Sequence, residues 1–287
     1  MKTIIVNSGN AALSVTIYNP HNEETIMLLH GGPGLPDYLE DIAIFLCQNF
    51  RVITFDQRGA GQSKLNGHAF SIDDYVDDIN TIAEALDIRT FHVFGHSWGG
   101  LLAQLYACRN QEKLISIFLC NPFPGVGQKW IMMEKDIIQF IKLSSSTVQW
   151  FKILYNYLAA RKGLEKADKA MRRMLVLLWS SYAKRYGLSG QNGEFKLRGI
   201  NAKALFKTRA NLIKTPDSSL EKLESIKSIP TLILFGAKDI FLQTKWITRT
   251  RYPLAQYIEL DGAGHFPWLE EEDNFKQLLL QFYDMKQ

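Results

Sequence analysis

Short apolar runs alternate with longer segments of helical periodicity along the first third of the chain. Each apolar run is bounded by Gly, Asn, Asp or Pro, as is typical of strands that end in turns. Helices are expected where apolar residues recur at i, i+3 and i+4. The expected strands are Leu13–Tyr18, Thr25–His30, Arg51–Phe55, Thr90–Phe94 and Ile115–Cys120, and the expected helices are Asp37–Gln48, Ser71–Leu86 and Leu101–Cys108. This alternation predicts an α/β fold whose mainly parallel sheet is buried on both faces.

The pattern changes between residues 122 and 228. Pro122 and Pro124 end the alternation, and the following stretch is long, rich in Lys and helical in its periodicity. Three segments there place apolar residues on one helix face. They are Ile137–Leu143, Trp150–Leu158 and Met171–Trp179. We therefore expect a helical cap over residues 122–228, inserted into a core formed by residues 1–121 and 229–287.

After Pro230 the strand–helix rhythm resumes. Strands are expected over Thr231–Phe235 and Gln256–Leu260, and a helix over Glu270–Tyr283 closes the chain. A length of 287 residues fits one core with an insertion, because large α/β domains often reach about 250 residues.

Composition narrows the class of protein. Hydrophobic residues make up 46% of the chain and charged residues 22%, which is ordinary for a globular domain and unlike a disordered chain. The net charge of +4 is too small to indicate a nucleic-acid partner. Three cysteines at wide spacing predict neither a disulfide framework nor a metal site.

Targeting signals are not evident in the sequence. The apolar N-terminal stretch turns polar at Asn7, which is too early for a secretory signal. No run of about 18 uncharged apolar residues predicts a membrane-spanning helix. The tract Met174–Trp179 is expected to pack inside the cap, with a lipid or partner surface as the alternative. We expect a cytoplasmic protein without stable membrane insertion, and the sequence leaves a homo-oligomer open.

The most informative segment has the pattern Gly-x-Ser-x-Gly between an expected strand and an expected helix. Its serine is Ser97, and the flanking glycines are Gly95 and Gly99. A serine on such a sharp turn takes a strained backbone conformation, and nearby glycines let chain segments approach closely. The helix that begins near Trp98 directs its free N–H groups toward the serine and favours negative charge there. The sequence therefore predicts Ser97 as a nucleophile.

A serine nucleophile needs a base, and the base needs an acid that orients it. Of the six histidines, His265 lies in a glycine-rich turn after the strand Gln256–Leu260, from which its ring can reach across the strand ends. Asp239 follows another strand, so its carboxylate is expected at the same sheet edge as Ser97. We predict Ser97, Asp239 and His265 as the catalytic residues.

The other histidines and a group of aspartates receive structural interpretations. His92 and His96 are expected to be structural, and His21 and His68 to lie on the surface. The aspartates of the second expected helix are interpreted as a solvated face. They are Asp73, Asp74, Asp77 and Asp78.

Two further glycine-rich turns follow strands. The first is His30-Gly31-Gly32-Pro33-Gly34, where a backbone N–H can approach a developing oxyanion. We assign the two oxyanion donors to the backbone N–H groups of Gly32 and Trp98. The second turn is Asp56-Gln57-Arg58-Gly59-Ala60-Gly61-Gln62-Ser63. Neither turn has the ending of a nucleotide-binding loop.

Together these motifs resemble the α/β-hydrolase fold superfamily and, within it, the proline iminopeptidase-like branch of serine peptidases. The resemblance implies an aminopeptidase for short peptides whose acidic cap residues hold the free amino group of the substrate. Glu134, Glu165 and Glu194 are the weak candidates for this role, and Asp37 and Glu40 near the oxyanion turn are further ones.

One departure from that branch keeps a second function open. The turn usually reads Gly-Gly-Ser-Trp-Gly-Ser, whereas here His96 precedes the serine and Gly100 ends the motif, as is common in general α/β-hydrolases. A carboxylesterase or lactonase for small apolar esters is the alternative, and a silent binding protein is a third hypothesis. Acyl transfer on a small-molecule or short-peptide substrate needs no metal or organic cofactor, because the oxyanion hole supplies the electrostatic stabilisation.

Overall fold

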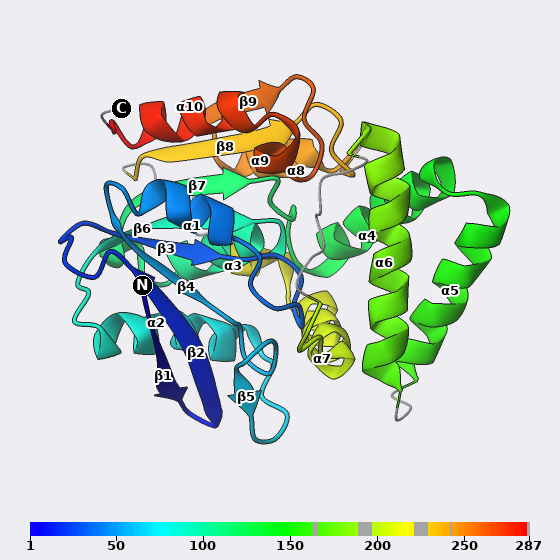
Figure 1. Ribbon diagram of the computed structural model, residues 1–287, viewed down its shortest axis with the longest axis horizontal. Helices are drawn as coiled ribbons and strands as arrows, with labels where there is room; N and C mark the ends of the chain where they lie inside the picture. Colours follow the sequence, from blue (N-terminus) through cyan, green and yellow to red (C-terminus); the bar gives the residue numbers. More distant parts are fainter. Residues whose placement is uncertain (163–165, 189–196, 221–228, 242, 286–287) are drawn as a thin grey trace.

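The computed structural model describes residues 1–162, 166–188, 197–220, 229–241 and 243–285. Its centre is a nine-stranded sheet in the order β1-β2-β4-β3-β6-β7-β8-β9, with β5 paired to β2 (Figure 1). The pairs formed by β2 are antiparallel, and the pairs from β4 through β3 to β9 are parallel. The strands are β1 Lys2–Ser8, β2 Ala11–Tyr18, β3 Thr25–Leu29, β4 Arg51–Phe55, β5 Lys64–Leu65, β6 Phe91–His96, β7 Leu114–Cys120, β8 Thr231–Gly236 and β9 Gln256–Leu260. The mainly parallel α/β sheet predicted from the sequence is confirmed.

Helices cover both faces of this sheet. The helices are α1 Glu40–Leu46, α2 Ile72–Ala85, α3 Trp98–Ala107, α4 Gly127–Ser144, α5 Thr147–Arg161, α6 Ala167–Tyr186, α7 Ala202–Lys214, α8 Lys245–Arg251, α9 Pro267–Glu270 and α10 Glu272–Phe282. Val93 of β6 packs in one apolar cluster with residues of α2 and α3, whereas Phe94 packs in another with residues of α1 and α10. Successive side chains of a strand point to opposite faces, so a strand covered on both sides is apolar throughout.

In the described ranges between β7 and β8, the chain forms helices α4 to α7. They form a separate group beyond one end of the sheet, with α5 outermost (Figure 1). The three segments expected to be helical lie inside α4, α5 and α6, and α7 was not expected. Residues of this group share an apolar cluster that includes Phe140, Ile153, Met171 and Tyr182. Within the described ranges, no helix is long and apolar enough to cross a membrane.

Besides α7, the elements β1, β5 and α8 were not expected, and the closing helix differs in form. β1 was not expected, because only Ile4, Ile5 and Val6 of its seven residues are apolar, but it pairs with β2 along its whole length. The short α8 was also missed. The closing helix is broken in two, because Glu271 has non-helical angles of φ −137° and ψ 56° between α9 and α10.

Candidate active site

Ser97 lies on a strained turn between β6 and α3. Its φ of 57° is in the left-handed region, which a residue with a side chain rarely adopts. The glycine expected after it is required by packing, because a Cβ on Gly99 would lie 1.9 Å from the carbonyl oxygen of Leu29 in the adjacent β3. We call residues 95–99 the serine turn. Its geometry agrees with the strand–turn–helix context that the sequence predicted.

His265 and Asp239 reach this turn from the loops that follow β9 and β8. His265 Nε2 is 3.0 Å from Ser97 Oγ, and His265 Nδ1 is 2.7 Å from Asp239 Oδ1. The tautomer with its proton on Nδ1 satisfies both contacts, since the ring then donates to the carboxylate and accepts from the serine hydroxyl. All three residues are buried, with 3–6% of their surface exposed. The structure therefore brings together the three side chains that the sequence selected.

A tyrosine of the cap region contacts the backbone of the His265 loop. The Tyr182 hydroxyl on α6 accepts a hydrogen bond from His265 N–H at 2.5 Å and donates one to Glu270 Oε1. Glu270 Oε2 accepts the N–H of Gly264 at 2.5 Å. Burial raises the pKa of Tyr182, and the negative charge of Glu270 raises it further, so the hydroxyl stays protonated and can donate. The loop is thus attached to both α6 and α9.

The carbonyl side of the same loop is held by the core. Asn121 Nδ2 donates to the carbonyl oxygen of His265 at 3.0 Å, and His96 Nε2 donates to it at 2.8 Å. His96 Nδ1 accepts a hydrogen bond from the Tyr38 hydroxyl at 2.7 Å, and that hydroxyl accepts one from the N–H of Gly31 at 2.8 Å. Burial lowers the pKa of His96 well below its usual value, and the nearby His265 lowers it further. His96 is therefore a neutral link between the His265 loop and the first glycine turn.

The two predicted oxyanion donors flank the serine. Gly32 lines the cavity beside Ser97 and has a φ of 68°, and Trp98 begins α3, where a backbone N–H has no partner inside its own helix. Gln57 connects the two segments, because its side chain donates to the carbonyl of His30 at 2.8 Å and accepts from the Trp98 indole at 2.8 Å. The second glycine-rich turn therefore fixes residues 30–34, which we call the oxyanion segment after their predicted role, relative to the serine turn.

A cavity of about 560 Å³ opens above Ser97, and we call it the serine cavity. Residues of the loops at the sheet edge and of helices α4 and α6 line it together, most of them apolar. The described lining residues are Gly32, Leu35, Tyr38, Ser97, Phe123, Ile137, Phe140, Ile141, Arg172, Leu175, Val176, Leu178, Trp179, Ser180, Ser181, Tyr182, Leu197, Ile240, His265 and Phe266. None of these described residues is Asp or Glu, and Arg172 is their only Lys or Arg.

None of the acidic candidates for an amine site that the structure describes lines the serine cavity. Glu134 does not line the serine cavity. Arg209 binds both of its carboxylate oxygens, at 2.5 and 2.7 Å, and the Trp130 indole donates a hydrogen bond to it at 2.8 Å. An arginine thus already neutralises the charge of Glu134, which argues against the predicted role in binding an amine. Asp37 and Glu40 do not line the cavity either. The remaining candidates, Glu165 and Glu194, lie outside the described residues.

One aspartate expected on a solvated helix face is buried. Asp78 is 1% exposed, and its two oxygens bind Arg58 of the second glycine-rich turn at 2.7 and 2.8 Å. Asp74 forms a capping box with Ser71 at the start of α2. Only Asp73 and Asp77 are exposed as predicted. The buried pair attaches the turn that carries Gln57 to α2.

His92 is structural, since its ring contacts Ser116 and Glu24 at 2.8 Å each. Within the described ranges, no group of three His, Cys, Asp or Glu residues is placed to hold a metal ion. The supporting residues Tyr182 and Glu270 were missed; Glu270 lies only five positions after His265, which is the one sequence signal that pointed to it.

Comparison with known proteins agrees with this geometry. A family model described as "alpha/beta hydrolase fold" matches residues 24–272. The chain belongs to that family. A proline iminopeptidase from Xylella fastidiosa is 25% identical over 273 residues, which cover 86% of this chain and 84% of the relative. The resemblance to the proline iminopeptidase-like branch is thereby confirmed.

Solved structures show the same fold with different activities in their names. An enol-lactonase from Burkholderia xenovorans superimposes with a TM-score of 0.74 at 18% identity, covering 98% of this chain and 100% of that one. A proline iminopeptidase from Mycobacterium smegmatis superimposes with a TM-score of 0.66 at 20% identity, covering 98% and 97% of the two chains. At these identities the likeness shows the α/β-hydrolase fold alone.

Proposed function

We propose that this α/β-hydrolase is a serine hydrolase that transfers acyl groups to water. The observation that carries the proposal is the continuous contact from Ser97 Oγ through the His265 ring to Asp239, at 3.0 and 2.7 Å, at the floor of a cavity. Ser97 attacks the substrate carbonyl while His265 takes its proton. Asp239 then stabilises the imidazolium that forms.

The remaining steps use the same residues. The oxyanion of the tetrahedral intermediate accepts hydrogen bonds from the backbone N–H groups of Gly32 and Trp98. His265 returns its proton to the leaving group, which departs and leaves an acyl group on Ser97. Water, deprotonated by His265, attacks this ester and releases the acid. Supports for the His265 loop keep the ring within reach of Ser97 in both halves of the cycle.

The lining of the serine cavity favours apolar esters or lactones over peptides with a free amino group. A half-buried ammonium group needs a carboxylate partner, and no described lining residue supplies one. Arg172 would repel such an ammonium. The alternative of a carboxylesterase or lactonase is therefore the function that the cavity supports best.

An aminopeptidase of the proline iminopeptidase type is the second candidate. It is favoured by the curated relatives of that name, including one at 25% identity over most of both chains. In this case Glu165 or Glu194, outside the described residues, would have to supply the carboxylate.

Initial rates on three substrates separate these functions. They are a 4-nitrophenyl ester of a medium-chain acid, an unblocked proline anilide and its N-blocked analogue. We expect turnover of the ester and little of either anilide. Preference for the unblocked anilide would overturn the ester assignment and establish the aminopeptidase.

The role of the three residues is tested on the ester. Ser97→Ala should lower kcat by about 10⁴-fold or more, and Asp239→Asn by about 10⁴-fold. Asp261→Asn is the matched control, because this carboxylate is exposed and lies four residues before His265. Full ester turnover by Ser97→Ala would refute the mechanism.

A further inference from the structure

One face of α6 runs from the predicted triad to an arginine. Arg172, Leu175, Trp179 and Tyr182 recur at helical spacing and all line the serine cavity. Tyr182 contacts the His265 backbone at one end of this row. Arg172 lies ten residues earlier, or about 15 Å along the helix axis at a rise of about 1.5 Å per residue. This face is therefore an apolar wall with a guanidinium at its far end.

Arg172 has no described partner of opposite charge. Its side chain is exposed, and it forms no ion pair with any carboxylate of the described ranges. By contrast, Arg58 and Arg209 are each bound by a carboxylate through two nitrogen–oxygen contacts. The guanidinium of Arg172 thus keeps its capacity to bind an anion in the same paired geometry.

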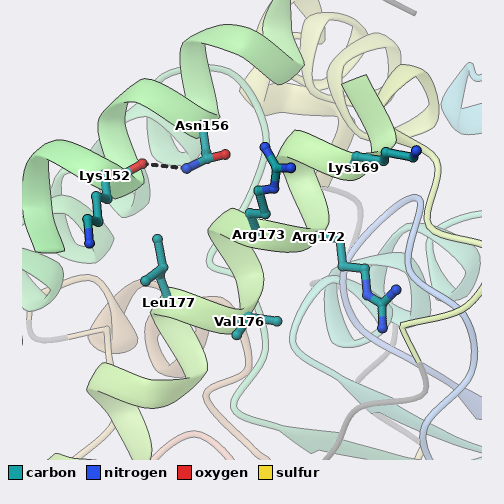
Figure 2. Close-up of a pocket in the computed structure, with 7 residues that line it drawn as sticks. All are labelled: Lys152, Asn156, Lys169, Arg172, Arg173, Val176 and Leu177. Atoms are coloured by element: carbon teal, nitrogen blue, oxygen red, sulfur yellow. Dashed lines mark hydrogen bonds between the residues drawn. The ribbon is translucent and has the colours of Figure 1, made fainter. Parts of the chain in front are cut away.

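Arg172 also borders a second cavity, of about 570 Å³, between α5 and α6 (Figure 2). We call it the cationic cavity. Its described lining residues are Lys152, Asn156, Lys169, Arg172, Arg173, Val176 and Leu177. In Figure 2, Arg173 points between the two helices toward Asn156, whereas Arg172 leaves α6 in another direction. Among the described lining residues, only Arg172 and Val176 line both cavities.

The net charge of the predicted cap, residues 122–228, is much more positive than that of the whole chain. Residues 122–228 hold 20 Lys and Arg against 8 Asp and Glu, a net charge of +12. The other residues hold 13 against 21, a net charge of −8, and the two sum to +4. A concentrated positive potential attracts anions to the cavities it surrounds. The cap region is therefore suited to a negatively charged ligand.

We propose that the substrate carries a negatively charged group, such as a carboxylate or phosphate, at the end remote from the scissile carbonyl, and that Arg172 binds this group. An apolar chain would lie along the face of α6 between Ser97 and Arg172. The inference rests on the proposed function and narrows its substrate class. The anionic group of a short substrate cannot reach the guanidinium of Arg172. The preference for an anionic over a neutral substrate must therefore grow with chain length.

Two matched series of 4-nitrophenyl esters test this length dependence. One series holds butyrate, hexanoate, octanoate and decanoate, and the other holds the monoesters of succinate, adipate, suberate and sebacate, in which a carboxylate replaces the terminal methyl. A second arm compares decyl acetate with the acetate ester of ω-hydroxydecanoate, followed by acid release, so that the charge sits on the alcohol side. The readout is the ratio of kcat/KM for the charged and the neutral ester of equal length. We expect this ratio to rise with length in the wild type.

Variants of the adjacent Arg172 and Arg173 distinguish binding at one arginine from a general attraction by the positive charge of the region. Arg172→Gln should lower the ratio for the longest pair by about tenfold or more, as expected for the loss of a paired charged hydrogen bond. Arg172→Lys should restore part of it. Arg173→Gln removes the same charge from the next position, which lines the cationic cavity alone, and should change the ratio by less than about twofold. Thermal unfolding of each variant verifies its fold.

The outcomes distinguish the two levels of the proposal. No turnover of any ester by the wild type would overturn both the proposed function and this inference. Turnover of neutral esters with a ratio that Arg172→Gln leaves unchanged in both arms would overturn the inference alone. Equal losses in Arg172→Gln and Arg173→Gln would also overturn it, because they would indicate a diffuse field rather than a site.

Discussion

Replacing Tyr182 by Phe removes one oxygen atom that joins α6 to the His265 loop. The ring and its packing remain, including the contacts with Trp179 and Phe266 at centroid distances of 5.7 and 5.4 Å. The substitution leaves the buried N–H of His265 without its acceptor, at a cost of about 1–3 kcal/mol, and removes a hydrogen bond to the charged Glu270, worth about 1.5–3 kcal/mol. We expect the free energy of unfolding to fall by about 3 kcal/mol.

The same substitution should slow catalysis. Without its acceptor the His265 loop can shift, and a displacement of about 1 Å at a catalytic group can cost about 100-fold in rate. We therefore expect Tm to fall by roughly 6–12 °C for a protein of this size and kcat on a 4-nitrophenyl ester to fall by about tenfold to 100-fold. Both quantities are measured on the same preparation, by calorimetry and by initial rates at saturation.

Tyr157→Phe is the matched control for this experiment. Tyr157 lies on the neighbouring α5 and packs against Phe206, away from the His265 loop. A loss below about 0.5 kcal/mol is expected there, as for most substitutions that break no buried contact. If Tyr182→Phe matched this control in both stability and kcat, the idea that α6 positions the His265 loop would be refuted.

Three further predictions concern other parts of the site. Gly99→Ala should destabilise the protein by more than about 3 kcal/mol in urea unfolding, because the new Cβ would lie 1.9 Å from the Leu29 carbonyl oxygen. Asp78→Asn should cost about 3–5 kcal/mol, because it removes the charge that compensates the buried Arg58. Burial lowers the pKa of His96, so below about pH 6.5 the unfolded chain binds a proton that the folded protein excludes, and stability is lost as pH falls. His96→Gln should reduce that pH slope by about 1.4 kcal/mol per pH unit.

Controls for these predictions come from exposed positions of the same chain. Gly9 also has a positive φ, of 57°, but open space around it, so Gly9→Ala should cost only about 1–2 kcal/mol. Asp73 forms an exposed ion pair with Arg109, and Asp73→Asn should cost at most about 1 kcal/mol. His68→Gln, at an exposed loop position, is the control for the pH slope. Variants that behave like their controls would contradict the corresponding prediction.

Local sequence signals were enough to predict most strands and helices and the three side chains that meet at the serine turn. The strands are apolar runs between turn residues, and the serine turn is specified by Gly95 and Gly99, where an added Cβ would lie 2.5 and 1.9 Å from a backbone carbonyl oxygen. His265 and Asp239 each follow a recognisable strand, and parallel strands deliver their ends to one edge. These features depend on residues close together in the sequence, which is why they could be predicted.

Features that depend on contacts across the chain could not be predicted. Tyr182 acts on a loop 83 residues away, and nothing around it in the sequence marks its hydroxyl. The charge of Glu134 is neutralised by Arg209, 75 residues later, so its local pattern resembled that of a free carboxylate. Asp78 stands in the same acidic stretch of α2 as the exposed Asp73 and Asp77. Its burial depends on the ion pair with Arg58, which the local sequence does not reveal. Such pairings are fixed by tertiary packing rather than by periodicity.

The position of the cap region in the sheet order has a consequence for how this protein can evolve. β7 and β8 are direct, parallel neighbours, so the chain leaves the sheet at the carboxyl end of β7, beyond Cys120, and re-enters it at Thr231, the amino end of the next strand in the sheet order. Insertions or deletions in that segment can reshape the cavity without shifting the strands that hold Ser97 and Asp239. A change of length inside β3 or β6 would instead alter their register and displace the oxyanion segment from the serine. Apart from the contact between Tyr182 and the His265 loop, the segment that lines the cavity and the strands that hold the serine turn can therefore change length independently.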